Sequence, residues 1–200
     1  MWPPPSPAGS VVTPEERRRL LAVARRAISD ALLRNVPPQA PPQSNKLISR
    51  CGVFVTLWQA GSLRGCVGKP ESPDPLDTTV ARCAVLSAFE DPRFPALRED
   101  ELEAIQIEVS VLSPLVPARP EDVEAGLHGV SLSRGAFRGL LLPQVAREFG
   151  WSREKLLCET CRKAGLDPFA WKDPETRLST FTAQSFSEAG VHSIPGGETR

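Results

Sequence analysis

The spacing of hydrophobic positions changes along the chain, and each spacing predicts a different element. Behind Thr13 the apolar side chains return every three or four positions as far as Leu32, which predicts an amphipathic helix with Thr13 as its N-cap and a capping box. Residues 76–90 repeat the helical spacing, and Pro92 stops them. Residues 105–112 alternate apolar and polar side chains, which predicts a strand with one face toward the core.

Two hairpins are predicted from β-branched and aromatic segments separated by turn signals. Residues 52–58 and 63–67 form the first, with a Gln-Ala-Gly-Ser turn between them. Residues 130–134 and 139–142 form the second. In an extended chain alternate side chains share a face, so Arg64 is expected on the same face as Cys66.

The C-terminal part of the chain continues with two helices and a strand. The helices are expected at residues 143–149 and 153–164, and the strand is expected to run without a break over residues 177–186. Strands grouped in hairpins, with helices placed irregularly among them, predict the α+β class: a largely antiparallel sheet with flanking helices.

The proline-rich ends of the chain contain few apolar side chains. Residues 1–13 and residues 189–200 are therefore predicted to be disordered tails on a single domain spanning residues 14–188. The proline-rich residues 35–45 are predicted to be a linker within that domain.

Charge and apolar composition narrow the class of protein. The chain has 24 basic and 24 acidic residues, and this balance gives no electrostatic drive toward nucleic acid or an anionic membrane. No apolar run has transmembrane length, and the start of the chain lacks the pattern of a signal peptide. A cytoplasmic location is expected. Five cysteines at irregular spacing predict no disulfide framework, in agreement with a reducing compartment.

The segment Leu63–Gly68 combines a thiol, a guanidinium and two glycines. A guanidinium on Arg64 close to Cys66 would favour the thiolate, the form that attacks electrophiles. Gly65 and Gly68 carry no Cβ, so a substrate could approach the backbone there. The alternative is structural, because cysteine is often buried and glycine in a strand often marks a bulge.

A catalytic Cys66 would need a group that moves a proton. Glu108 lies on the polar side of the predicted strand 105–112, which is either exposed to solvent or turned toward Cys66. His128 is one of two histidines and is either a structural turn residue or the general base of the thiol. Arg93, just beyond the helix 76–90, either caps the last carbonyls of that helix, the favoured role, or binds a substrate.

The remaining cysteines are given packing roles. Cys83 has helical spacing with the apolar residues around it. Cys158 and Cys161 form a C-x-x-C pair inside a helix, without the second pair of ligands that a tetrahedral zinc site requires. No structural metal and no cofactor are expected.

Six segments together resemble the AMMECR-one-like family, also called AmmeMemoRadiSam system protein A. They occur in the family's order between about Pro14 and Glu188. They are Gly-Val-Phe-Val-Thr-Leu at 52–57, Leu-Arg-Gly-Cys-Val-Gly at 63–68, Asp-Pro-Arg-Phe at 91–94, Ile-Glu-Val-Ser-Val-Leu at 107–112, Gly-Leu-Leu-Leu-Pro-Gln-Val-Ala at 139–146 and Cys-Arg-Lys-Ala-Gly-Leu at 161–166.

The resemblance implies an α+β fold of two unequal lobes, with the Leu63–Gly68 segment at a cleft between them. It implies two partners, a Memo-like protein similar to extradiol dioxygenases and a radical S-adenosylmethionine protein. It supplies no reaction. Two functions are therefore weighed evenly: an enzyme for an unknown small molecule with Cys66, Arg64 and either His128 or Glu108 as catalytic groups, or a non-catalytic module that binds a ligand or a protein.

Overall fold

A computed structural model describes residues 12–34 and 51–189 of the chain. The predicted tails and the proline-rich linker lie outside these residues, apart from residues 12, 13 and 189. Within the described part, no helix combines the length and the apolar character needed to cross a membrane.

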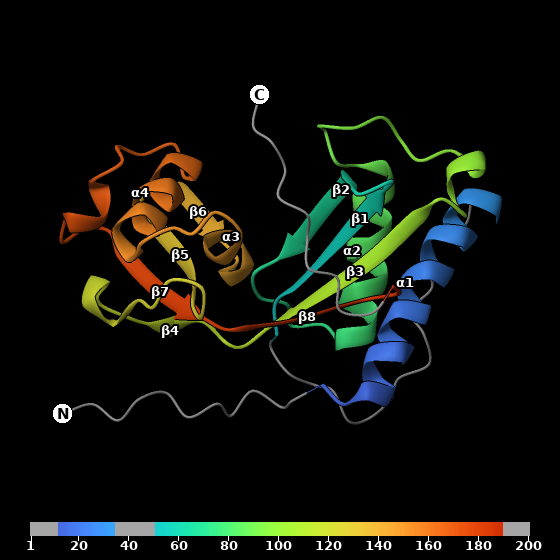
Figure 1. The fold of residues 1–200 in the computed structure, drawn as a ribbon, viewed down its shortest axis with the longest axis horizontal. Helices are drawn as coiled ribbons and strands as arrows, with labels where there is room; N and C mark the ends of the chain where they lie inside the picture. The colour runs from blue at the N-terminus through green and yellow to red at the C-terminus, as the bar shows by residue number, and fades with distance from the viewer. Residues whose placement is uncertain (1–11, 35–50, 190–200) are drawn as a thin grey trace.

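The larger of two lobes, here called the first lobe, is an antiparallel sheet with two helices on one face (Figure 1). The strand order is β2-β1-β3-β8, so β2 is an edge strand. The elements are α1 (Pro14–Arg34), β1 (Val53–Gln59), β2 (Ser62–Lys69), α2 (Leu76–Phe89), β3 (Ile105–Leu112) and β8 (Ala183–Ser187), with a 3₁₀ turn η1 (Glu99–Glu101) before β3.

The capping box predicted at the start of α1 is confirmed. The backbone N–H and the hydroxyl of Thr13 both donate to the Glu16 carboxylate, at 2.8 and 2.9 Å. The N–H of Glu16 donates to the Thr13 hydroxyl at 3.3 Å. These bonds satisfy backbone donors that a helix start otherwise leaves unpaired.

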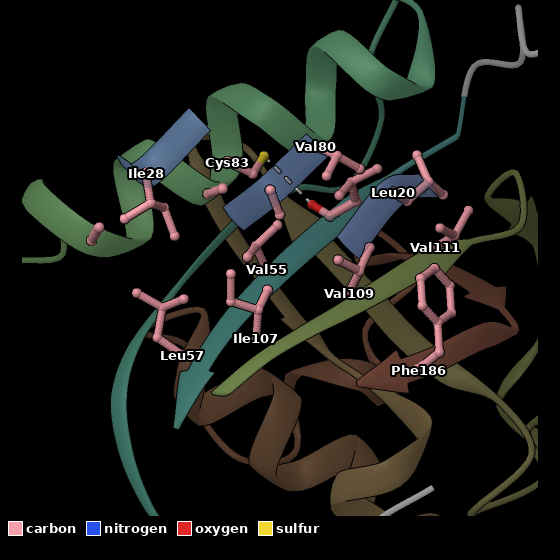
Figure 2. Close-up of a cluster of buried hydrophobic side chains, with 14 of the residues drawn as sticks. Leu20, Ile28, Val55, Leu57, Val80, Cys83, Ile107, Val109, Val111 and Phe186 are labelled. Atoms are coloured by element: carbon pink, nitrogen blue, oxygen red, sulfur yellow. Dashed lines mark hydrogen bonds between the residues drawn. The ribbon is translucent and has the colours of Figure 1, made fainter. Parts of the chain in front are cut away.

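The core of the first lobe lies between the helices and one face of the sheet (Figure 2). Leu20 and Ile28 of α1 and Val80 of α2 are fully buried over the sheet, as is Cys83, which confirms its predicted packing role. The strands contribute the apolar residues of their alternating pattern to this core: Val55, Leu57, Ile107 and Val109. The polar side of these strands consequently faces away from α1 and α2.

The second lobe is a smaller antiparallel sheet, ordered β4-β7-β5-β6, with its own core. Helix α4 packs on β5 and β6 through Leu156, Leu157 and Cys161. Its elements are β4 (Val116–Pro117), η2 (Pro120–Asp122), β5 (Gly129–Arg134), β6 (Phe137–Leu141), α3 (Pro143–Glu148), α4 (Arg153–Lys163), η3 (Ala170–Lys172) and β7 (Arg177–Phe181).

The single closing strand predicted over residues 177–186 is wrong. The chain leaves the sheet pattern at Thr182, so that β7 belongs to the second lobe and β8 to the first. Figure 1 shows this segment crossing from one lobe to the other. A hinge of one residue between two alternating segments leaves the period-two pattern almost intact, and for that reason the pattern did not reveal it.

A third apolar cluster lies where the lobes meet. Leu112 of β3, Leu140 of β6 and Phe181 of β7 are buried together, with Phe54 and Leu142 packed against them. The predicted α+β class is confirmed, with two antiparallel sheets of four strands in place of one. The open face of the first sheet therefore meets the second lobe at this cluster.

Candidate functional site

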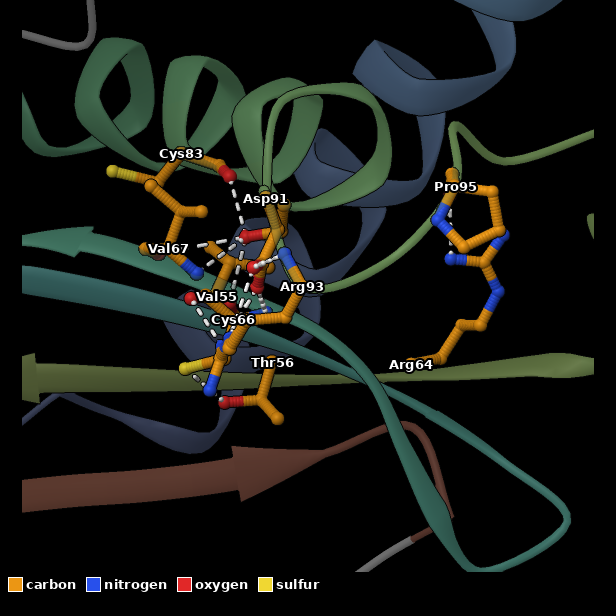
Figure 3. A network of polar contacts seen from close by, with 10 residues as sticks. Val55, Thr56, Arg64, Cys66, Val67, Cys83, Asp91, Arg93 and Pro95 are labelled. Carbon is orange, nitrogen blue, oxygen red and sulfur yellow. Dashed lines mark hydrogen bonds and ion pairs between the residues drawn. The ribbon is translucent and has the colours of Figure 1, made fainter.

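Cys66 lies on the edge strand β2 and is held by three neighbours (Figure 3). Its backbone N–H donates to Asp91 Oδ2 at 2.8 Å, and its carbonyl accepts from Arg93 Nη2 at 3.1 Å. Thr56 of the neighbouring strand β1 is paired with Cys66, and its hydroxyl donates to the sulfur at 3.4 Å. The thiol is half-buried, so it combines a fixed position with access to solvent.

Asp91 and Arg93 act together on this strand edge. The guanidinium of Arg93 donates from Nε and Nη2 to the two oxygens of Asp91, at 2.9 and 2.7 Å. This pair holds the pKa of the buried Asp91 carboxyl well below its usual range, with the Cys66 N–H as a smaller contribution. The carboxylate is therefore charged at neutral pH and fixes the backbone of Cys66.

The favoured prediction that Arg93 caps α2 is wrong. Among the described residues its recorded hydrogen bonds go to Asp91 and to the Cys66 carbonyl, and none goes to a carbonyl of the last turn of α2. Arg93 instead brings a positive charge to the backbone of Cys66, and its own pKa is raised mainly by the hydrogen bonds to Asp91.

The expectation that Arg64 shares a face with Cys66 is also wrong. The register between β1 and β2 shifts at a bulge, so that Gly65 pairs with Leu57 while Leu63, and not Arg64, pairs with Trp58. Residues paired across neighbouring strands point to the same face of the sheet. Arg64 is the extra residue of the bulge, so its side chain no longer follows the alternation that would place it on the face of Cys66. Figure 3 shows its side chain lying apart from Cys66, beside Pro95.

Arg64 is buried in a separate ion pair. It donates from Nε and Nη2 to Glu101 at 2.8 and 2.9 Å, and from Nη1 to the Pro95 carbonyl at 2.9 Å. The guanidinium lowers the pKa of Glu101 to about 2. The position of the pair makes Arg64 an anchor for the segment between α2 and β3.

Glu108 lies in the same row of the sheet as the thiol. Thr56 pairs with Cys66 on one side and with Glu108 on the other, so all three side chains share the face opposite the helices. Burial raises the pKa of Glu108, and a hydrogen bond from the Trp58 side chain lowers it by less. Two strand spacings of about 4.8 Å separate Glu108 from Cys66, about 10 Å in all, which is beyond direct hydrogen-bond reach.

The two glycines of the motif are explained by close packing against protein. A Cβ on Gly65 would meet the Ser87 carbonyl oxygen of α2 at 2.2 Å. A Cβ on Gly68 would meet the Phe54 ring at 2.4 Å. Both positions exclude a larger side chain for structural reasons, and contact of either glycine with a substrate stays a prediction.

His128 lies in the second lobe, in the loop before β5. Its Nδ1 accepts a hydrogen bond from the Glu124 backbone N–H at 3.0 Å, within its own turn. Among the described residues no contact between His128 and Cys66 is recorded, and its role as a base stays a prediction.

Lys163, at the C-terminal end of α4, is a residue that sequence reasoning did not single out. The residue is exposed, yet desolvation by neighbouring protein atoms lowers its pKa, with smaller contributions from Cys66, which raises the pKa, and from Arg93, which lowers it. The approach of α4 agrees with this position, because Gly139 of β6 lets Thr160 and Ala164 pack closely over it. A lysine of the second lobe therefore lies within electrostatic range of the thiol.

Cys83 and Cys161 are buried thiols in the cores of the two lobes. Burial raises the pKa of Cys83 to about 11 and also raises that of Cys161. Cys158 and Cys161 are free thiols inside α4. Within residues 12–34 and 51–189, no three His, Cys, Asp or Glu side chains are grouped to hold a metal ion.

Comparison with known proteins gives one consistent result. The model of the AMMECR1 family matches residues 21–186. A protein of Methanothermobacter thermautotrophicus is 44% identical over 184 residues, covering 88% of this chain and 96% of its own length. A Thermococcus gammatolerans protein is 42% identical over 182 residues, covering 84% of this chain and 88% of its own.

A solved structure extends this agreement to the fold. The crystal structure of an uncharacterised protein from Pyrococcus horikoshii superimposes with a TM-score of 0.83 at 38% identity, over 90% of this chain and 94% of that one. The match of the family model covers most of the chain and includes both lobes and the Cys66 strand. The chain belongs to the AMMECR1 family.

Proposed function

We propose that this AMMECR1-family protein is a cytoplasmic enzyme that acts on an electrophilic small molecule with the Cys66 thiolate as nucleophile. The observation that carries the proposal is the surroundings of the sulfur. Thr56 donates a hydrogen bond to it, Arg93 donates to the carbonyl of the same residue, and Lys163 of the other lobe lies within electrostatic range. Reactive cysteines in proteins typically lie beside hydrogen-bond donors and positive charges of this kind.

The groups around Cys66 divide the work of such a reaction. The thiolate forms a bond to an electrophilic carbon while a bond from that carbon to a leaving group breaks, and the leaving group departs with the electron pair. The departing atom, bonded to the attacked carbon, leaves as an anion, and Glu108, with its raised pKa, is the candidate to move a proton at the far end of a substrate that spans about 10 Å of the sheet. Arg64 acts as a positioning residue through the ion pair with Glu101.

The alternative is a binding module in which Cys66 only packs. It is favoured by the role of the Cys66 backbone, whose N–H and carbonyl tie β2 to Asp91 and Arg93 whatever the side chain does. A Memo-like protein and a radical S-adenosylmethionine protein remain the proposed partners in both cases, and the family resemblance is what supports them.

Alkylation by iodoacetamide separates the two functions. A nucleophilic Cys66 is expected to be labelled fastest of the five cysteines at mildly acidic pH, because a free thiol with a pKa of about 8.5 holds little thiolate there. Lys163→Gln is expected to slow this labelling, and Arg162→Gln, which removes an exposed charge from the same helix turn, is the control. Labelling of Cys66 at or below the rate of Cys158 would remove the case for an enzyme.

A further inference from the structure

The face of the first sheet that lies opposite α1 and α2 carries an acid without a base beside it. Thr56 of β1 pairs with both Cys66 and Glu108, and Glu108 pairs with Ser187 of β8, so these four side chains form one row on this face. Two residues along the strands, the next row of the same face consists of Gly68, Phe54, Ser110 and Ser185. Glu108 is the one acid of these two rows, and neither row contains a lysine or an arginine.

Glu108 has acceptor capacity that the protein leaves unused. In the described part of the chain, the recorded partner of its side chain is Trp58, and no positive charge is recorded as acting on its pKa. The charges that act on Lys163 are those of Cys66 and Arg93, so this lysine does not serve as the cation for Glu108. A carboxylate accepts several hydrogen bonds, and a half-buried one is costly without a positive partner.

A second unsatisfied group adjoins Glu108 on the same face. Gln144 of α3 reaches across from the second lobe, and its Nε2 lies 3.4 Å from both the Ser110 and the Ser185 hydroxyls. Ser110 follows Glu108 by two residues of β3, a distance of about 7 Å along the strand. The Oε1 of Gln144 is buried and has no hydrogen-bond partner. In the reversed orientation of the amide its Nε2 would be the atom without a partner, so one polar atom is open in either case.

We propose that this face binds a small molecule with a cationic nitrogen group, an ammonium or a guanidinium, whose N–H groups donate to Glu108. Another polar group of the same molecule meets the open amide atom of Gln144, and its reacting carbon lies at Cys66. Ser185 is exposed, and Cys66 and Glu108 are half-buried, so a solute can reach the two rows. This inference rests on the proposed function and adds to it the chemical class of the substrate. Glu108 is ionised in this role, so a proton that it moves in the reaction is one that it accepts.

Melting in the presence of simple organic cations tests the site. The probes are propylammonium chloride and propylguanidinium chloride, and the reference is tetramethylammonium chloride, a cation that has no N–H group. The wild type is melted over a series of concentrations at constant ionic strength, and the dissociation constant is obtained from the rise in melting temperature. We expect a saturable rise with the ammonium or the guanidinium probe and none with the reference. No saturable rise with either probe would overturn the proposal.

Two variants of equal charge change locate the bound cation. Glu108→Gln retains the shape of the side chain and should weaken binding of the probe about tenfold, the loss of a charge-assisted hydrogen bond. Glu99→Gln removes an exposed acid of η1 in the same lobe and should leave the dissociation constant unchanged. Equal dissociation constants in the wild type and in Glu108→Gln would overturn the assignment of the cation to this face.

A probe with a second polar group tests the part of Gln144. The 3-hydroxypropyl form of the cation that binds is expected to bind about threefold more tightly than the propyl form, because a hydroxyl can pair with either amide atom. This preference should vanish in Gln144→Met, which removes the amide and keeps the length of the side chain. A preference that is absent in the wild type, or that survives in Gln144→Met, would overturn the site. The same comparison locates the site if Glu108→Gln does not fold.

The melting experiments do not depend on the thiol, so the two proposals can fail separately. Absence of cation binding together with fast alkylation of Cys66 would overturn the substrate class and support the nucleophile. Cation binding that depends on Glu108, together with an unreactive Cys66, would overturn the enzyme and support the binding site.

Discussion

The ion pair between Arg64 and Glu101 is expected to be a major source of stability, and Arg64→Met measures it. The two side chains are 9% and 14% exposed, so solvent screens them little. The substitution leaves the Glu101 carboxylate without its guanidinium and the carbonyls of Pro95 and Ala96 without a donor. Methionine retains the length of the apolar part of arginine, so that the loss reports the guanidinium.

The magnitude follows from the pKa of Glu101. Its ordinary value of 4.5 falls to about 2 in the fold. At about 1.4 kcal/mol for each tenfold change in proton affinity, the folded state favours the ionised form by about 3 kcal/mol. The Arg98 backbone N–H supplies a smaller part of this. Removing one partner of a buried pair typically costs about 3 to 5 kcal/mol, so we expect a loss of about 3 kcal/mol.

Urea unfolding followed by tryptophan fluorescence at pH 7 provides the assay. The matched control is Arg98→Met, which breaks the pair with Asp100, whose partners are 72% and 68% exposed. This control should leave the free energy of unfolding almost unchanged. The difference between wild type and Arg64→Met should shrink as the pH falls from 4.5 toward 2, because Glu101 then becomes protonated. A loss below about 1 kcal/mol at pH 7 would refute the reasoning.

Three further outcomes are expected. Gly65→Ala should lower the melting temperature strongly, because its Cβ would lie 2.2 Å from the Ser87 carbonyl oxygen and α2 would have to move. Ser87→Ala should cost about 1 to 3 kcal/mol in urea unfolding, because it removes the hydroxyl that accepts from the Val67 N–H at 2.9 Å. Acid titration of the wild type should show full stability above about pH 5 and a loss below it, because Asp91 and Glu101 have lowered pKa values and must take up protons; stability that is flat down to pH 3 would contradict this.

The local elements of this fold could be predicted because local patterns determine them. The capping box at Thr13 and the turn between β1 and β2 each depend on residues within four positions of one another. Thr182 shows the limit of such patterns. The residue separates two strands of similar alternation, and which sheet each strand joins depends on partners far away in the sequence.

The candidate site was harder to predict because its charges come from distant segments. Alternation along a strand placed Arg64 beside Cys66, but the bulge in β2, opposite Leu57 and Trp58, breaks that alternation. No sequence spacing indicates a bulge of this kind with certainty. Lys163 lies nearly a hundred residues beyond the thiol, on a different lobe, and only the packing of α4 on β6 brings it near.

Two arginines therefore have separate roles at the two ends of residues 91–101, the segment that links α2 to β3. Arg93 and Asp91, at its start, hold the backbone of Cys66, while Arg64 holds its end through Glu101. Because both ends are tied to β2, the segment is fixed along the edge of the strand that carries the thiol. Arg93 supplies the positive charge beside Cys66 that the sequence assigned to Arg64, and Arg64 anchors the far end of the segment that carries Arg93.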